Sequence, residues 1–138
     1  MARPTGYLAS AVLAGIAALH VAWGRGSSFP YADRDEVAAK VVGSSAVPPP
    51  AACYAVAGAL VVASGLAADV PVGPPALRRM GRAGVATVLG VRGVLGRAGR
   101  TDVASPGSDG AAFRRLDRRI YSPLCLALAA ATVTARRP

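Results

Sequence analysis

The chain has 138 residues, which is enough for one domain. Only 17% of them are charged, against about 25% in a typical soluble domain, and 53% are hydrophobic, so an ordinary soluble protein is not expected. The net charge of +9 would suit a nucleic-acid-binding protein, but the arginines flank apolar blocks, as they do in membrane proteins. We therefore expect membrane lipids, and no nucleic acid, as partners.

Four apolar blocks predict four helices, over residues 5–23, 51–68, 81–97 and 120–135. A helix that crosses a hydrocarbon core of roughly 30 Å needs about 20 apolar residues. The first two blocks meet this length, whereas the last two are short and need flanking residues or local thinning of the bilayer. In a soluble protein, such helices would leave too little polar sequence to cover them. The predicted fold is all-α: one transmembrane domain over residues 1–138, built as an integral membrane four-helix bundle.

The first block could also be a cleaved signal peptide, because Arg3 precedes an alanine-rich stretch. A signal peptide ends in small residues at its cleavage site, whereas this block runs on into His-Val-Ala-Trp at residues 20–23. We therefore expect a retained helix.

A short helix at the membrane interface is predicted in each long connector. In residues 24–50, Asp33 and Glu36 have the spacing of a capping box, and Gly43 is placed to end a helix. The second connector, residues 97–119, ends in an amphipathic pattern with Phe113 and Leu116 on one face. Its remaining faces carry a basic set that suits an anionic lipid surface: Arg114, Arg115, Arg118 and Arg119.

An even number of crossings puts both termini on one side of the membrane and both long connectors on the other. The long connectors hold nine Arg and Lys residues, and the termini and the short turn over residues 69–82 hold six. Because positive charge accumulates on the cytoplasmic side, the count favours cytoplasmic long connectors.

The distinctive polar and aromatic residues fall toward the helix ends that face the long connectors. Part of this pattern is the aromatic belt of membrane proteins. The candidate polar cluster at this end consists of His20, Trp23, Arg92, Asp117 and Tyr121.

Arg92 is the unusual member, because an arginine inside a spanning helix costs at least ~2.5 kcal/mol at the helix centre. We expect it to face the bundle and to find a partner. The candidates are Asp117, Asp102, the Tyr121 hydroxyl and carbonyls exposed by Pro123. In the alternative, Arg92 extends to the lipid phosphates at the membrane surface.

The chain has one histidine, so no metal site and no cofactor are expected. We expect His20 to be neutral and hydrogen-bonded between helices. Cys53 and Cys125 begin the second and fourth predicted helices and form a candidate thiol pair at similar depth. Free thiols are favoured, and a structural disulfide would require the connectors to face outward.

Several residue pairs share a spacing of 72: Cys53 with Cys125, His20 with Arg92, and Gly24-Arg25 with Gly96-Arg97. A duplication would give two parallel helical hairpins, related by a pseudo-twofold axis along the membrane normal. Alanine-rich sequence also matches itself by chance, so both explanations stay open.

Three segments resemble a known bacterial family. They are Leu-His-Val-Ala-Trp-Gly-Arg-Gly at residues 19–26, Val-Arg-Gly at residues 91–93, and Phe-Arg-Arg-Leu-Asp-Arg-Arg-Ile-Tyr-Ser-Pro-Leu-Cys-Leu at residues 113–126. Together they look like the family catalogued as domain of unknown function 3995. The resemblance implies a small multi-pass protein of the bacterial plasma membrane, and it transfers no mechanism.

Three classes of function fit these observations. The favoured one is a non-enzymatic membrane protein that binds anionic lipid, a partner membrane protein or further copies of itself. The second is a membrane-surface enzyme, with His20 as acid or base, Arg92 as anion binder and a cysteine thiol. The third is a small oligomeric transporter, although transport sites lie near the midplane and these polar residues lie toward one end. No catalytic set is readable.

Overall fold

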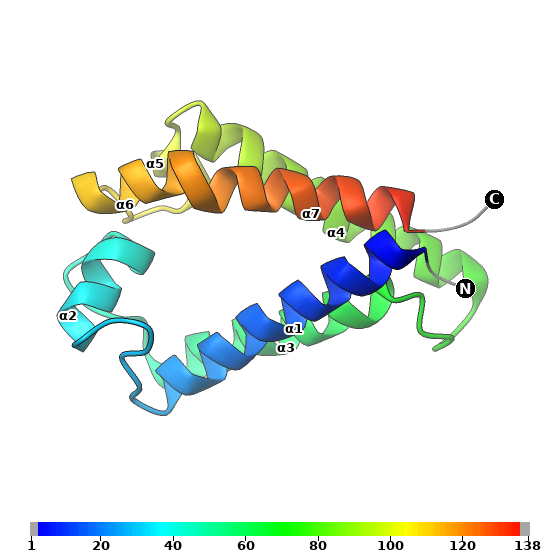
Figure 1. Cartoon of the computed structure of the whole chain (residues 1–138), viewed down its shortest axis with the longest axis horizontal. Helices are drawn as coiled ribbons and strands as arrows, with labels where there is room; N and C mark the ends of the chain where they lie inside the picture. Colours follow the sequence, from blue (N-terminus) through cyan, green and yellow to red (C-terminus); the bar gives the residue numbers. More distant parts are fainter. Residues whose placement is uncertain (1–2, 136–138) are drawn as a thin grey trace.

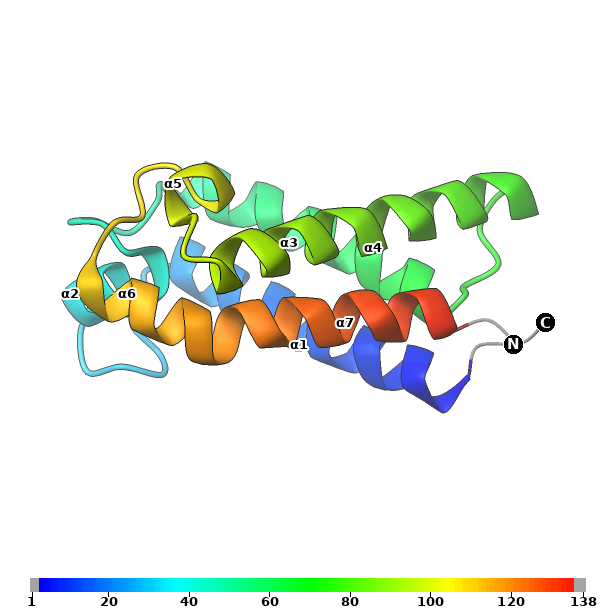
Figure 2. The same ribbon diagram turned by 90° about the horizontal axis from the view of Figure 1, so that it is seen from above.

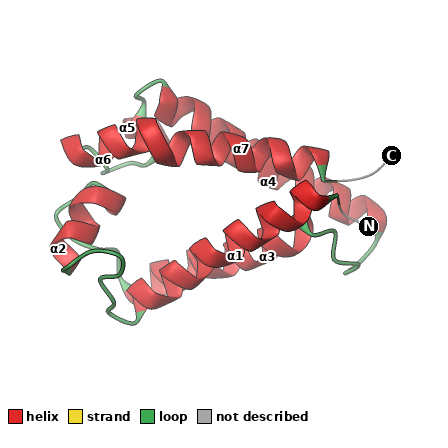
Figure 3. Cartoon of the chain, viewed as in Figure 1, coloured by secondary structure: helices red, strands yellow, loops and turns green. Residues whose placement is uncertain are grey.

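The structure is a computed structural model that describes residues 3–135. Every regular element in this range is helical, which confirms the predicted all-α class (Figure 3). The elements in chain order are α1 (Pro4–Gly24), α2 (Arg34–Val37), η1 (Ala38–Val42), α3 (Pro50–Ala67), α4 (Pro75–Arg97), α5 (Thr101–Ala104), α6 (Ala111–Leu116), η2 (Asp117–Tyr121) and α7 (Ser122–Thr134). The two η elements are π-helical turns.

The long helices form two antiparallel hairpins. Helix α1 packs along α3, and α4 packs along α7 (Figures 1 and 2). The beginning of α1 and the end of α7 lie at the same end of the molecule, where the two hairpins come closest in Figure 1. There, Ala9 and Leu13 of α1, Ala63 and Ala67 of α3, and Leu128 of α7 form a buried cluster. Small residues dominate this cluster and let the helices approach closely.

Prolines set the beginnings of three long helices, because a proline in the first turn loses no hydrogen bond. Helices α1 and α3 begin at Pro4 and Pro50 and match the predicted helices closely. Helix α4 begins at Pro75, well before the predicted residue 81. The prediction assigned Arg78 and Arg79 to the turn before the helix, but both arginines lie in the first turns of α4.

The fourth predicted helix is longer than expected. Elements α6, η2 and α7 follow one another without a break, since the residues at their junctions all have helical backbone angles. A short helix is therefore present in the second connector as predicted, but it continues into the next helix, over Ala111 to Thr134, and is not separate from it. Its location at the membrane interface stays a prediction.

The π turn explains how this helix tolerates a proline. Pro123 has no N–H, and in a regular helix its ring would press on the carbonyl of Arg119. In η2 the N–H of Ser122 instead donates to the carbonyl of Asp117, five residues back. The widened turn directly before Pro123 keeps the helix continuous.

The first long connector contains the predicted capped helix. The carboxylate of Asp33 accepts a hydrogen bond from the Glu36 N–H at 2.9 Å, and the Glu36 side chain accepts one from Ala32. Gly43 ends the segment at a φ of +77°. Both predicted boundaries are therefore confirmed.

The same connector reaches across to the second hairpin at Gly43. The backbone N–H groups of Asp109 and Gly110 donate to the Gly43 carbonyl at 3.2 and 3.1 Å. The ring of Phe113 lies against the Gly43 backbone, where a Cβ atom would come within 2.7 Å of it. Because the residue must be small and must adopt a positive φ, glycine suits this contact.

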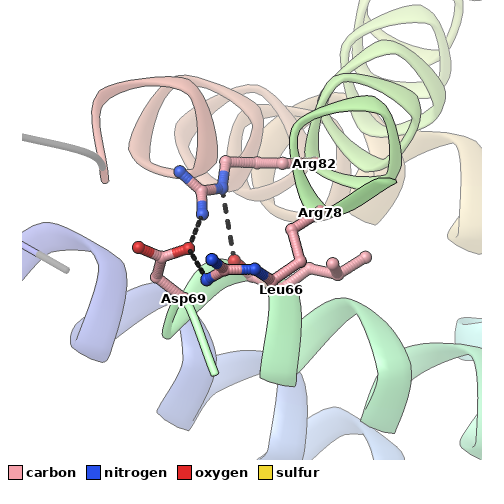
Figure 4. Close-up of polar contacts among 4 residues, drawn as sticks. All are labelled: Leu66, Asp69, Arg78 and Arg82. Atoms are coloured by element: carbon pink, nitrogen blue, oxygen red, sulfur yellow. Dashed lines mark hydrogen bonds and ion pairs between the residues drawn. The ribbon is translucent and has the colours of Figure 1, made fainter. Parts of the chain in front are cut away.

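At the opposite end, the turn between α3 and α4 holds an ion-pair cluster in which Arg82 is buried and Asp69 and Arg78 are partly buried (Figure 4). The Asp69 carboxylate receives Arg82 at 2.5 Å and Arg78 at 3.1 Å. The Nε of Arg82 also donates to the Leu66 carbonyl at 3.3 Å. These contacts fasten the end of α3 to α4 and so join the two hairpins; the sequence had indicated only a short, Arg-rich turn.

Two of the described helices, α1 and α3, are long and apolar enough to cross a membrane. Helix α4 carries arginines at both ends and Arg92 between them, and α7 alone has 13 residues. Length and composition thus support spans in the first hairpin only.

Replacing Arg82 with Gln should lower the free energy of unfolding by about 2 kcal/mol, because a buried, charged hydrogen-bond donor to Asp69 is removed while Arg78 still pairs with that carboxylate. Thermal unfolding of the purified protein in detergent, followed by circular dichroism, measures the effect. Arg79→Gln is the matched control, since Arg79 is exposed and should change stability by less than about 0.5 kcal/mol. Equal stability of the two variants would contradict the assigned role of Arg82.

Candidate functional site

An ion pair between Arg92 of α4 and Asp117 of η2 is the centre of the candidate site. The Nη2 of Arg92 lies 2.5 Å from Asp117 Oδ1. The Asp117 side chain is fully buried, and that of Arg92 is 22% exposed. The arginine therefore faces the neighbouring helix rather than extending to the surface.

Ser122 completes the cluster by donating its hydroxyl to the second oxygen of Asp117, Oδ2, at 3.1 Å. Ser122 is itself fully buried. Each oxygen of the Asp117 carboxylate thus has a polar partner, which offsets the cost of burying its charge.

The π turn places Asp117 and Ser122 on the same face. In a regular α-helix, residues five positions apart point about 140° away from each other. A π turn holds more residues and brings positions five apart nearly into line. The hydroxyl of Ser122 can therefore reach the carboxylate of Asp117 on its own helix.

Two glycines of α4 make room for this cluster. A Cβ atom on Gly96 would overlap Ser122 Oγ and Asp117 Oδ2 and would come within 2.5 Å of Arg92 Nη1. A Cβ atom on Gly93 would lie 2.9 Å from the Ser122 carbonyl. Neither glycine nor Ser122 was among the predicted site residues, although the Gly-x-x-Gly spacing beside Arg92 was a readable signal of close helix contact.

Asp102, another partner considered for Arg92, pairs with Arg100 instead, at 3.1 Å. Both side chains are exposed. The hydrogen bond from Arg100 lowers the pKa of the Asp102 carboxyl.

Tyr121, one turn after Asp117, links the two connectors. Its hydroxyl donates to the Lys40 carbonyl at 2.9 Å, and its ring lies 6.0 Å from that of Phe113. The Lys40 ammonium in turn lies 4.9 Å from the ring centre of Tyr31. The hydroxyl of Tyr121 is therefore engaged with a carbonyl and not with Arg92.

The two remaining members of the predicted cluster, His20 and Trp23, lie together on α1. Their rings meet edge to face at 5.0 Å, and the Trp23 Nε1 donates to the Phe29 carbonyl at 2.7 Å. His20 Nδ1 lies 2.9 Å from the Ile16 carbonyl, so it bonds within its own helix and not between helices as expected. Within residues 3–135, no hydrogen bond or ion pair joins these two residues to Arg92 or Asp117.

Both cysteines are free thiols. Cys53 is buried beside Trp23 and Val37, with its Sγ 3.7 Å from the Pro48 carbonyl. Cys125 lies on α7 and is only partly buried.

The predicted basic residues lie on the exposed side of the joined helix: Arg114, Arg115, Arg118 and Arg119. Among the described residues, none of them has an acidic partner within ion-pair distance. The same part of the chain contains no group of three or more His, Cys, Asp or Glu residues that could hold a metal ion.

Fold and site together define an all-helical protein with two candidate membrane spans and a buried Arg–Asp–Ser cluster. The chain belongs to the family described as protein of unknown function (DUF3995), whose sequence model matches residues 13–132. This confirms the resemblance read from the sequence, and the matched range includes the whole cluster. Neither the curated proteins nor the solved structures gave a match.

A methyl group at position 96 should disrupt the cluster. We expect Gly96→Ala to lower the free energy of unfolding in detergent by about 2 kcal/mol, as overpacking does. Gly84→Ala is the control on the same helix, because a Cβ atom there meets nothing within 4 Å and alanine favours the helix. If Gly96→Ala were as stable as Gly84→Ala, the close packing at Gly96 would be refuted.

Proposed function

We propose that this protein crosses the bacterial plasma membrane four times, as two hairpins, and binds anionic lipid at its connector end without catalysing a reaction. One observation carries the proposal: large apolar side chains are exposed along every long helix, whereas Asp117, Ser122 and Thr132 are fully buried. This is the reverse of the distribution in a soluble protein.

The exposed apolar side chains form a belt around both hairpins: Leu8 on α1; Val56, Val61 and Val62 on α3; Val88, Val91 and Val94 on α4; and Leu124 and Val133 on α7. Only 22% and 28% of the most apolar stretches of α1 and α3 are buried. A core helix of a soluble protein would bury most of its residues. Lipid chains would cover this belt and remove its contact with water.

The charges of α4 are compatible with a span because most of them stand at its ends. Arg78, Arg79 and Arg82 lie in its first turns, and Arg97 is its last residue. Of its arginines, only Arg92 lies between these ends, and its pairing with Asp117 reduces the cost of placing it in the membrane.

The helix boundaries support two hairpins related by pseudo-twofold symmetry. Helices α1 and α4 begin 71 residues apart, at Pro4 and Pro75, and end 73 residues apart, at Gly24 and Arg97. Gly24 and Gly96 are 72 residues apart, and each receives a side chain from the partner helix of its hairpin: Tyr54 on α3 and Ser122 on α7.

No observation favours the enzyme or the transporter. The enzyme would need His20 and Arg92 to act together, but they bond to separate partners on different hairpins. The carboxylate of Asp117 is closed off from any substrate. The buried charges lie toward the ends of the helices, away from the midplane position that transport sites occupy.

Labelling of single cysteines tests the four crossings. In a background with Cys53→Ala and Cys125→Ala, a membrane-impermeant thiol reagent should reach Ser45→Cys and Ser105→Cys from the same side. Val72→Cys, in the exposed turn, should react from the other side. With cytoplasmic connectors, Val72→Cys reacts in intact cells, and the other two react in inverted vesicles.

The pair Ser45→Cys and Ser105→Cys decides between topologies. If only α1 and α3 crossed the membrane, Ser105→Cys would react from the same side as Val72→Cys. That pattern would overturn the proposal.

The basic surface tests the lipid role. Each arginine near an anionic membrane surface contributes about 1 kcal/mol of attraction. Changing Arg114, Arg115, Arg118 and Arg119 together to Gln should therefore weaken retention of phosphatidylglycerol by the detergent-solubilised protein at least tenfold, about 1.4 kcal/mol. Native mass spectrometry measures the retained lipid, and phosphatidylcholine with the same chains is the reference.

Exchange of Arg3 and Arg79 for Gln removes charge from the opposite end and is the control. This control variant should still retain more phosphatidylglycerol than phosphatidylcholine, because its connector end is unchanged. Undiminished binding by the fourfold variant would contradict the lipid role.

A further inference from the structure

Two arginines from different helices meet at the connector end of the second hairpin. Arg97 is the last residue of α4, and its Nη1 donates to the carbonyl of Arg118 in η2 at 2.9 Å. The guanidinium of Arg118 lies over Gly99, where a Cβ atom would come within 2.6 Å of its Nη2. A backbone carbonyl thus holds the Arg97 side chain, and the Arg118 side chain lies close to the backbone that follows α4.

This pair has no acidic partner. Within residues 3–135, no acidic side chain lies within ion-pair distance of Arg97 or Arg118; Asp117 pairs with Arg92, and Asp102 with Arg100. Both Arg97 and Arg118 are exposed. Arg97 and Arg118 therefore bring two positive charges to one contact without a counter-charge, and an anion bound there would reduce their repulsion.

The geometry points to a binding site for the phosphate of one anionic phospholipid between Arg97 and Arg118. Guanidinium groups bind phosphate oxygens through paired hydrogen bonds, and the second Nη of Arg97 is free for such a contact. This inference rests on the membrane location proposed above, because it places the pair at the lipid headgroups.

The surroundings favour a lipid over a free phosphate ion. On α4, Val94 is one turn before Arg97 and is 59% exposed, and Val91, one turn further, is 53% exposed. A phosphate held at Arg97 would therefore have an apolar strip beside it, leading into the membrane. Acyl chains can cover this strip, and inorganic phosphate cannot.

The other arginines of the joined helix differ from Arg97 in how their side chains are held. No side-chain hydrogen bond holds Arg114, Arg115 or Arg119 in the described part of the chain, whereas Arg97 is held by one. Mobile arginines attract an anionic surface in general. A guanidinium that is already held, as that of Arg97 is, favours binding of one particular headgroup, because less side-chain freedom is lost on binding.

Native mass spectrometry of the full chain in detergent tests the site, with phosphatidylglycerol as the probe and phosphatidylcholine of the same chains as the reference. The ionic strength should be about 0.15 M, where attraction beyond about 8 Å is screened. Arg97→Gln with Arg118→Gln should weaken phosphatidylglycerol binding at least tenfold, from about 1 kcal/mol per arginine. Phosphatidylcholine binding should not change.

Two further variants serve as controls for the Arg97→Gln, Arg118→Gln double variant. Arg25→Gln with Lys40→Gln removes the same charge from the same end but from the first hairpin, where Arg25 stands 72 residues before Arg97. It should weaken binding less than about threefold, since it lies outside the site. Arg97→Lys with Arg118→Lys keeps the charge and loses the paired hydrogen bonds, so it should give intermediate binding.

The outcomes separate this inference from the proposed function. If changing Arg114, Arg115 and Arg119 to Gln weakened binding as much as changing Arg97 and Arg118, the surface would attract lipid diffusely, and the specific site would be refuted while the lipid role stood. If neither variant weakened binding, both the specific site and the lipid role would be refuted.

Glycerol phosphate tests for a soluble ligand. If it displaced phosphatidylglycerol at equal concentration, the site would be assigned to a soluble phosphate, and the assignment to a lipid would be refuted. Circular dichroism verifies the fold, and Arg118→Gln alone, expected to weaken binding at least threefold, repeats the test if the double variant unfolds.

Discussion

The cost of a charge away from water is the constraint on which the second hairpin depends. Arg92 lies within α4, and its side chain faces the neighbouring helix. It is tolerated there because Asp117 supplies the opposite charge and Ser122 satisfies the remaining carboxylate oxygen. The contact in turn requires Gly96 on one helix and a π turn on the other. Helix spacing, helix geometry and sequence at this end all follow from one buried ion pair.

Sequence reasoning predicted the helical class, the first two long helices and the capped helix at Asp33, because apolar runs and caps are local signals. It failed where a local change in composition did not coincide with a change in structure. The change from basic to apolar residues near Ile120 resembled a helix boundary, yet the helix continues through it. A π turn leaves no periodicity that a sequence shows, so the alignment of Ser122 with Asp117 was not foreseen.

The partner of Arg92 was narrowed to a few groups, and the geometry decided among them. Asp102 and Asp117 were both candidate carboxylate partners, and the sequence did not distinguish them. In the structure, Asp102 follows the end of α4 and is paired with Arg100. The cluster at Asp69 was missed because arginines beside an apolar block are expected at the membrane surface. The backbone of Asp69 also has a φ of +55°, a conformation that residues other than glycine rarely adopt, and the residues around it did not predict it.

The separation of Arg92 and Asp117 along the chain has a consequence for biosynthesis. The two residues are 25 positions apart, on segments that leave the ribosome one after the other. Helix α1 is apolar enough to enter a bilayer alone, but α4 carries an unneutralised arginine until Asp117 has been synthesised. Under the proposed four crossings, we therefore expect α4 and the helix that carries Asp117 to enter the membrane together.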